Sequence, residues 1–140
     1  KHEAFDMVWE NAAIVDQANS GTGCAIIHSD SSVGIQRLNQ EAAKAMSAGN
    51  RAGFNISPSR AIKWITLNPA KALGIVDKTG SLEAGKMADV VIWDGNPFSV
   101  YTKTEKVFVD GVLLYDKDNK SLPKATDFEL GIINSQENRL

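Results

Sequence analysis

The sequence has little of three things that would each indicate a class of protein: cysteine, long apolar runs and an excess of one charge. Its one cysteine, Cys24, cannot form an internal disulfide or a thiolate-rich metal site. No stretch approaches the ~20 consecutive apolar residues of a membrane span. A net charge of −2 leaves no basic footprint for nucleic acid. We therefore expect no disulfide scaffold, no membrane partner and no nucleic-acid partner.

What the sequence does have is the composition of an ordinary globular protein. Its 140 residues are 43% hydrophobic and 23% charged, which argues against wholesale disorder. This length fits one domain on the usual scale of about 100–200 residues and allows a substantial core. The chain begins with Lys1 rather than Met and has no signal-like segment. We therefore expect the natural N-terminus to lie upstream, and the compartment stays open.

The first half of the chain has helical periodicity around one short apolar run. A first helix, ending near Gly21, is predicted from apolar residues at helical spacing, namely Phe5, Val8, Trp9, Ala12 and Val15. Residues 24–27 form a continuous apolar run, typical of a parallel strand buried on both faces. A second helix is predicted with its apolar face between residues 35 and 46. The order helix, strand, helix is typical of an α/β layer.

Capping residues predict where the helices of this half begin and end. Gly49 is well placed to cap the second helix. Ser57-Pro58 is typical of an N-cap followed by proline in the first turn, and Asn68-Pro69 repeats the pattern. Gly74 is expected to end the short helix that Asn68 begins.

The second half changes to short β-branched runs separated by turn residues. Residues 88–94 predict one strand, and residues 107–115 predict a hairpin whose two-residue loop is Asp110-Gly111. Beyond Lys117 the chain becomes polar and is expected to form a surface tail. That tail carries four apolar residues that could dock it: Phe128, Leu130, Ile132 and Ile133.

Residues 80–87 match the spacing of a phosphate-binding loop, but the chemistry and context do not fit. Met87 stands where the loop needs a hydroxyl residue for Mg²⁺. Such a loop also needs a preceding strand and a following helix, whereas a predicted strand begins almost directly after Met87. We interpret the segment as a β-turn with Gly85 at a positive φ.

His28 and Asp30, at the end of the apolar run, are the cluster with catalytic promise. Residues two apart on a strand share a face, and the carboxyl end of a strand is where α/β folds place ligands. Asp30 could therefore bind a metal ion or accept a proton. It could equally cap the next turn with help from Ser31 and Ser32, and on spacing alone this reading is the more common one. One histidine and one aspartate also fall short of a three-ligand site.

Other chemically notable residues have ordinary structural explanations. Trp9, Trp64 and Trp93 each fall within an apolar pattern, so we expect them in the core. Cys24 lies inside the apolar run with no histidine or lysine partner suggested, which favours an inert buried thiol.

Residues 64–75 and 79–93 closely resemble the C-terminal signature of the amidohydrolase superfamily, and more narrowly the metal-dependent hydrolases related to imidazolonepropionase. The hairpin at 107–115 is similar to the strands that usually end those proteins. Residues 26–30 resemble the last barrel strand, whose terminal aspartate is a metal ligand and catalytic base. By this resemblance, Asp30 would be both metal ligand and general base.

The resemblance implies an α/β fold that is the C-terminal fragment of a (β/α)₈ TIM-type barrel followed by part of a small β-sandwich. Residues 1–75 would be the last barrel segment with its following short helices, 76–116 the sandwich part and 117–140 a polar tail. The function implied is hydrolysis of amide, cyclic amide or related carbon–nitrogen bonds in a small-molecule substrate. One or two divalent metal ions, usually zinc, would be the cofactor.

The resemblance also implies that most of the site comes from elsewhere. The family's other ligands, a His-x-His pair among them, match no position here, since the chain has only His2 and His28. We therefore expect the missing N-terminal part of the same protein as a partner, with a homo-oligomer open. The fragment alone would be inactive and would bind no metal stably. The alternative from the residues is a self-contained α+β binding or oligomerisation module without catalysis.

Overall fold

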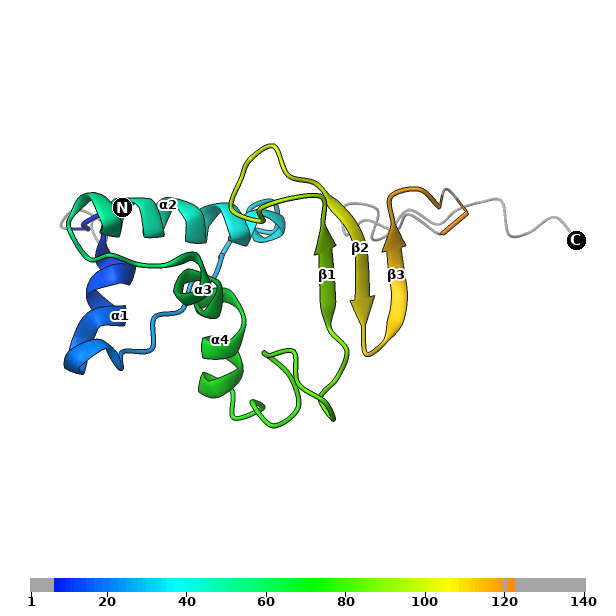
Figure 1. Cartoon of the computed structure of the whole chain (residues 1–140), viewed down its shortest axis with the longest axis horizontal. Helices are drawn as coiled ribbons and strands as arrows, with labels where there is room; N and C mark the ends of the chain where they lie inside the picture. Colours follow the sequence, from blue (N-terminus) through cyan, green and yellow to red (C-terminus); the bar gives the residue numbers. More distant parts are fainter. Residues whose placement is uncertain (1–6, 120, 123–140) are drawn as a thin grey trace, which may run out of the picture.

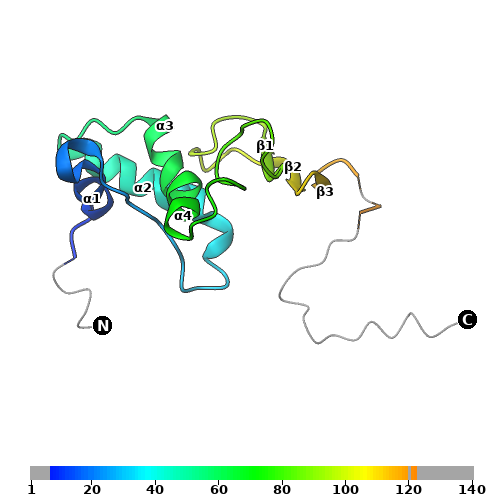
Figure 2. The same ribbon diagram turned by 90° about the horizontal axis from the view of Figure 1, so that it is seen from below.

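The structure is a computed structural model that describes residues 7–119, 121 and 122. Helices gather at one end and a small sheet lies at the other, an arrangement that two perpendicular views share (Figures 1 and 2). The helical elements are α1 (Asn11–Gly21), η2 (Ile35–Arg37), α2 (Leu38–Arg51), α3 (Pro58–Ala61), η3 (Ile62–Ile65) and α4 (Leu67–Ala72). The strands are β1 (Val90–Trp93), β2 (Thr104–Val109) and β3 (Val112–Asp116). The fold is thus a mixture of helices with a small antiparallel sheet.

α1 begins later than the sequence pattern predicts, and its buried face is different. The helix starts at Asn11, so Val8 and Trp9 precede it and do not share its register. Trp9 is 81% exposed, and the prediction that it lies in the core is wrong. The buried positions of α1 are instead Ala13 and Asp16. Phe5, the first residue of the predicted stripe, lies outside the described residues.

α2 runs past the glycine that was predicted to cap it. The helix continues to Arg51, and Gly53, at φ +91°, follows its C-cap. Gly49 is buried where α2 crosses α1, and a Cβ there would lie 2.5 Å from the Cβ of Ala13. This glycine is needed for close helix packing rather than for chain reversal, so the cap prediction is wrong.

The predicted starts of the next two helices have different outcomes. Ser57 is the N-cap of α3, since its hydroxyl accepts a hydrogen bond from the Arg60 N–H at 3.2 Å, and Pro58 occupies the first turn. Asn68 does not cap α4, which already begins at Leu67. Its side chain is 7% exposed and donates to the Ala25 carbonyl at 2.7 Å instead. Gly74, at φ +71°, follows the end of α4 as predicted.

The apolar run at residues 24–27 is extended but is not assigned as a strand. A strand is defined by hydrogen bonds to a neighbouring strand, and within the described part of the chain this run has none. It is held by the helical layer instead, because the Ile27 N–H donates to the Trp64 carbonyl at 3.1 Å and Ala25 accepts from Asn68. The prediction of a parallel strand at residues 24–27 is therefore not confirmed within the described part of the chain.

The core of the helical part is small and is centred on one aromatic residue. Trp64 is fully buried, as predicted, and is the largest fully buried side chain among the described residues. Four smaller residues pack with it in the buried cluster: Ala13, Ala25, Ile56 and Ala61. Alanines at three of these positions allow the helices to approach closely.

The sheet has the order β1-β2-β3 with both pairings antiparallel. Asp110 and Gly111 both have positive φ, at +49° and +80°, and join Val109 directly to its partner Val112. The hairpin predicted from this dipeptide is therefore confirmed. Asp89 ties the hairpin loop down, since its carboxylate accepts from the Asp110 N–H at 2.9 Å and from the Thr79 hydroxyl at 2.8 Å. These two hydrogen bonds lower the pKa of Asp89.

The segment resembling a phosphate loop forms a turn, and no helix follows it before β1. Gly85 has φ +91°, as predicted for a β-turn. The Lys86 ammonium donates to the Ser81 hydroxyl at 2.6 Å, so it is engaged within the segment itself. The geometry that would present backbone amides to phosphates is absent from this described segment.

Two contacts join the sheet to the helices. The Asn39 side chain, near the start of α2, donates to the Pro97 carbonyl at 2.6 Å, and Phe98 packs against the Trp64 core. Across the described residues, no helix is long and apolar enough to cross a membrane. The predicted docking residues Phe128, Leu130, Ile132 and Ile133 lie outside the described residues, as does His2.

Candidate functional site

Alternating burial gives residues 24–30 two distinct faces. Ala25 is 2% exposed and both Ile27 and Ser29 are half-buried, whereas Ile26, His28 and Asp30 are exposed. His28 and Asp30 lie on the exposed face, as their two-residue spacing predicts. Cys24 shares this parity and is exposed as well, so the prediction of a buried thiol is wrong. The exposed face of the run therefore carries Cys24, His28 and Asp30.

The Asp30 carboxylate is open to solvent and is not used by the surrounding fold. Its side chain is 97% exposed, and it accepts no hydrogen bond from the residues that the structure describes. The nearest charged partner is His28, whose Nδ1 lies 3.6 Å from Asp30 Oδ1. This distance is too long for a hydrogen bond. Both groups are thus available to an incoming ligand.

The turn after Asp30 is capped by serines rather than by the aspartate. The Ser29 hydroxyl accepts from the Ser31 N–H at 3.0 Å, and the Ser31 hydroxyl accepts from the Gly34 N–H at 3.1 Å. Together these bonds close the loop that leads into η2. The capping role that competed with chemistry for Asp30 is therefore filled by its neighbours.

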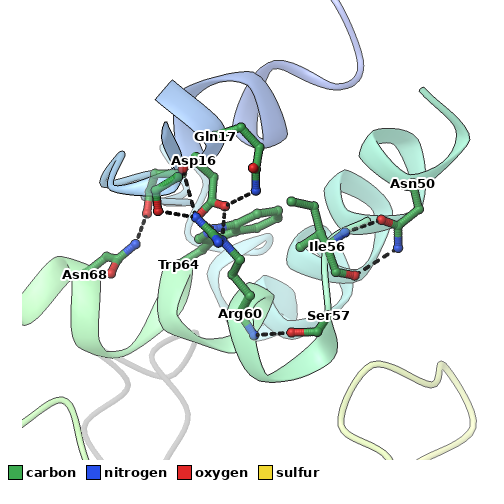
Figure 3. Close-up of polar contacts among 10 residues, drawn as sticks. Asp16, Gln17, Asn50, Ile56, Ser57, Arg60, Trp64 and Asn68 are labelled. Carbon is green, nitrogen blue, oxygen red and sulfur yellow. Dashed lines mark hydrogen bonds and ion pairs between the residues drawn. The ribbon is translucent and has the colours of Figure 1, made fainter. Parts of the chain in front are cut away.

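Behind the exposed face, a buried ion pair fixes the helical layer on which this run rests (Figure 3). Asp16 is 3% exposed, and both of its carboxylate oxygens accept hydrogen bonds, one from Arg60 Nε and one from Trp64 Nε1 at 2.8 Å. Arg60 Nη2 also donates to the Asp16 and Gly21 carbonyls at 3.0 and 2.5 Å. A buried carboxylate requires this degree of pairing.

The Asp16–Arg60 ion pair could not be predicted from local sequence patterns. Asp16 and Arg60 are 44 residues apart, and nothing local distinguishes Asp16 from a solvent-facing residue of an amphipathic helix. The one available signal was that Trp64 would need an acceptor for its indole N–H if buried.

A groove of about 470 Å³ lies between α1, the extended run and α2. Its lining residues are Met7, Asn11, Ala12, Val15, Ala25, Ile26, Ile27, His28, Glu41 and Ala45. Several of the apolar residues on this side are exposed to solvent, including Met7 at 61% and Val15 at 49%. Of the apolar stripe predicted for the first helix, Ala12 and Val15 line this groove, and Ala12 also packs against the Trp64 core.

The donor set for a metal ion is incomplete in this part of the chain. Among the described residues, no three histidine, cysteine, aspartate or glutamate side chains come close enough to hold a metal ion. Asp30 and His28 offer at most two donors, whereas zinc sites have at least three protein ligands. Any metal site that uses Asp30 must therefore take ligands from outside the described residues.

Comparison with known proteins identifies the family. The family model described as "Amidohydrolase family" matches residues 11–117 of this chain. The chain therefore belongs to the amidohydrolase family, as the sequence motifs indicate.

Its relatives include enzymes of one named activity. The imidazolonepropionase of Shewanella baltica (strain OS185) is 56% identical over 41 residues, which are 29% of this chain and 10% of that protein. The imidazolonepropionase of Shewanella oneidensis is 54% identical over the same length. The predicted kinship with this group is confirmed.

A solved structure matches over most of the chain. An amidohydrolase from Thermotoga maritima MSB8 aligns with a TM-score of 0.69 and 32% identity over 84% of this chain. This structural alignment covers 28% of the Thermotoga maritima chain. The matches to the two imidazolonepropionases cover 10% of each of those proteins. The matched region is thus a minor part of each protein to which this chain is similar.

Proposed function

We propose that this chain is the C-terminal portion of a metal-dependent hydrolase, in which Asp30 is a metal ligand and the general base. Its substrates would be small molecules with non-peptide amide, cyclic amide or related carbon–nitrogen bonds. The observation that carries the proposal is the free carboxylate of Asp30, at the end of the extended run, inside the segment that matches the amidohydrolase family. Serines fill the competing capping role.

The rest of the site would come from the N-terminal part of the same protein. The exposed groove beside His28 and the unpaired extended run are the surfaces that it would cover. Covering them would complete a (β/α)₈ barrel, and further strands would complete a β-sandwich around β1–β3. A strand laid against residues 24–29 would also satisfy backbone groups that helices cannot reach.

When bound, a divalent ion, which we propose to be zinc, would lower the pKa of a water molecule toward neutrality. Asp30 would accept a proton from the attacking water on one carboxylate oxygen. The resulting carboxylic acid would then donate that proton to the leaving nitrogen as the carbon–nitrogen bond breaks. Because no described residue donates a hydrogen bond to this carboxylate, no internal bond has to break before it takes part.

This chain alone should neither hydrolyse such substrates nor hold zinc at one ion per chain, since the described residues offer too few ligands. Metal analysis of the purified 140-residue chain checks this. Stoichiometric zinc would contradict the proposal that the ligands come from other polypeptide.

The catalytic role of Asp30 can be tested in a chimera. Residues 11–117 would replace the aligned segment of the Thermotoga maritima amidohydrolase, and activity would be measured on that enzyme's own substrate. Asp30→Asn should lower kcat by about 10²–10⁴-fold, the range for loss of a general base. Asp77→Asn, at an exposed aspartate away from this face, is the matched control and should retain the activity of the chimera.

Two outcomes would overturn the proposal. One is an active chimera in which Asp30→Asn and Asp77→Asn are equally active. The other is a chimera that folds and fills its metal site but is equally inactive with or without Asp30. A native chain that is monodisperse and binds a protein partner without any other barrel part would favour the alternative of a non-catalytic module.

A further inference from the structure

A second cavity, of about 460 Å³, opens on a different part of the helical layer. It lies between the end of α1 with the following residues 21–23 and the elements α3, η3 and α4. We call it the basic pocket, and its charged lining residues are Asp16, Arg60, Lys63 and Lys71. It contains neither Asp30 nor His28.

The basic pocket carries an uncompensated positive charge. Its three cationic side chains face one carboxylate, which leaves a net charge of +2. Lys63 and Lys71 form no ion pair with any described residue, whereas four lysines elsewhere in that part of the chain do. The one carboxylate, Asp16, is 3% exposed and already satisfied by Arg60 and Trp64. It therefore offers no acceptor to a ligand.

Arg60 is held in place by hydrogen bonds before any ligand arrives (Figure 3), and it keeps one donor group free. Its Nε and Nη2 atoms donate to Asp16 and to the Asp16 and Gly21 carbonyls. Its Nη1 group donates to no atom of the described residues. Because the guanidinium is already fixed, little side-chain entropy remains to be lost when a ligand accepts from Nη1.

Hydroxyl groups add further donors to the same pocket. Ser59 lines it, and its hydroxyl has no hydrogen-bond partner within the described ranges. Ser57 also lines it and uses its oxygen as an acceptor from the Arg60 N–H, which leaves its hydroxyl hydrogen free to donate. The pocket thus offers two hydroxyl groups and three cationic side chains as donors.

We propose that the basic pocket binds a phosphate group, either free or as a small phosphate monoester. A phosphate dianion matches the net charge of the pocket and supplies several acceptor oxygens to ammonium, guanidinium and hydroxyl donors. This inference is independent of the hydrolase proposal, since it uses none of the residues assigned to hydrolysis.

The test is an NMR titration of the full chain with inorganic phosphate and, separately, with glycerol phosphate, at constant ionic strength. The Arg60 Nε–H and Ser59 amide signals should shift and saturate. The double variant Lys63→Gln/Lys71→Gln should weaken binding by about tenfold for each lysine removed, as expected when a charge-assisted hydrogen bond is lost. Arg60 is left intact because it also holds Asp16.

The matched control is Lys78→Gln/Lys103→Gln, which removes the same charge at two exposed lysines outside the pocket. It should bind phosphate within twofold of the unsubstituted chain. The proposal would be overturned if the chemical shifts grow linearly without saturation, or if both double variants lose phosphate affinity equally. Either result would mean that phosphate is attracted only by general charge. Saturation by succinate but by neither phosphate compound would overturn the assignment to phosphate.

Discussion

The helical layer and the sheet of this chain are stabilised in different ways. The helical layer has a core that excludes solvent, in which Trp64 is fully buried and Asp16 is 3% exposed. In the sheet, by contrast, no residue of β1, β2 or β3 is fully buried. The sheet is held by ladder hydrogen bonds, a tight hairpin loop and ion pairs at its surface, such as Lys106–Asp116 at 2.7 Å.

The helical layer therefore has a hydrophobic core of its own, and the sheet does not. A three-stranded sheet becomes independently stable when one face packs on something. Among the described residues of this region, only the loop around Phe98 reaches the helical core. This agrees with our proposal that β1–β3 are part of a larger sandwich. Substitutions in the helical layer and in the sheet should therefore differ in how far their effects on stability spread.

Trp64→Ala should destabilise the helical layer most. It removes the largest buried side chain, at a cost of about 3–5 kcal/mol, and deprives Asp16 of a hydrogen-bond donor. Hydrogen exchange should show faster exchange of the α1 and α2 amides, while the β2–β3 amides keep most of their protection. Equal loss of protection in both regions would mean that the sheet depends on the Trp64 core.

Gly49→Ala should have the next largest effect, since its new methyl group would lie 2.5 Å from the Ala13 Cβ where α1 crosses α2. Overpacking of this kind costs about 1–3 kcal/mol, partly offset by the helix propensity of alanine. Urea unfolding followed by circular dichroism measures it. Ser47→Ala, at an exposed position of the same helix, is the control and should change stability by about 0.5 kcal/mol or less. Equal effects in the two variants would contradict the close crossing.

Acid should loosen the sheet at the Asp89 contact. The hydrogen bonds from the Asp110 N–H and the Thr79 hydroxyl lower the pKa of Asp89 in the folded state. Its contribution to stability is therefore fully present above the unfolded pKa of about 3.9 and is lost as the pH falls through the lower folded value. The chemical shift of the Asp110 amide, followed from pH 6 downward, should report this loss.

Two aspartate variants test whether Asp89 causes the pH dependence of the Asp110 amide. Asp89→Asn should abolish the pH dependence of the Asp110 amide, and Asp77→Asn, at an exposed aspartate outside the sheet, should preserve it. A titration of the Asp110 amide that persists in Asp89→Asn would assign the effect to another group.

Lys44→Gln should have the smallest effect. The Lys44–Glu41 pair has an N–O distance of 2.6 Å, but the two side chains are 68% and 47% exposed. Surface pairs of this kind contribute about 0.5 kcal/mol or less. Urea unfolding that shows a loss above about 1 kcal/mol would mean that surface charge matters as much in the helical layer as packing does.

Features set by neighbouring residues could be predicted from the sequence, and features set by distant contacts could not. Ser57-Pro58 and Asp110-Gly111 form the predicted cap and hairpin loop, because a cap or a tight turn depends on a few adjacent residues. Gly49 was assigned to a helix end because its packing partner, Ala13, is far away in the sequence. The strand at 24–27 was predicted from its apolar character, but pairing requires a neighbour that these described residues do not supply.

In the candidate site, too, local features could be predicted from the sequence and features set by distant residues could not. The shared face of His28 and Asp30 follows from the two-residue period of extended chain, and the structure confirms it. That serines rather than Asp30 cap the following turn became visible only from the observed hydrogen bonds. The Asp16–Arg60 pair and the basic pocket depend on residues about 40 positions apart, and local sequence patterns do not identify contacts at that separation.

The most direct test of the Asp30 assignment is a crystal structure of the chimera with the Thermotoga maritima amidohydrolase, with the metal located by its anomalous scattering. We predict that a carboxylate oxygen of Asp30 lies about 2.0–2.2 Å from the metal ion, the distance of a direct ligand. A fully occupied metal ion whose ligands do not include Asp30 would contradict it.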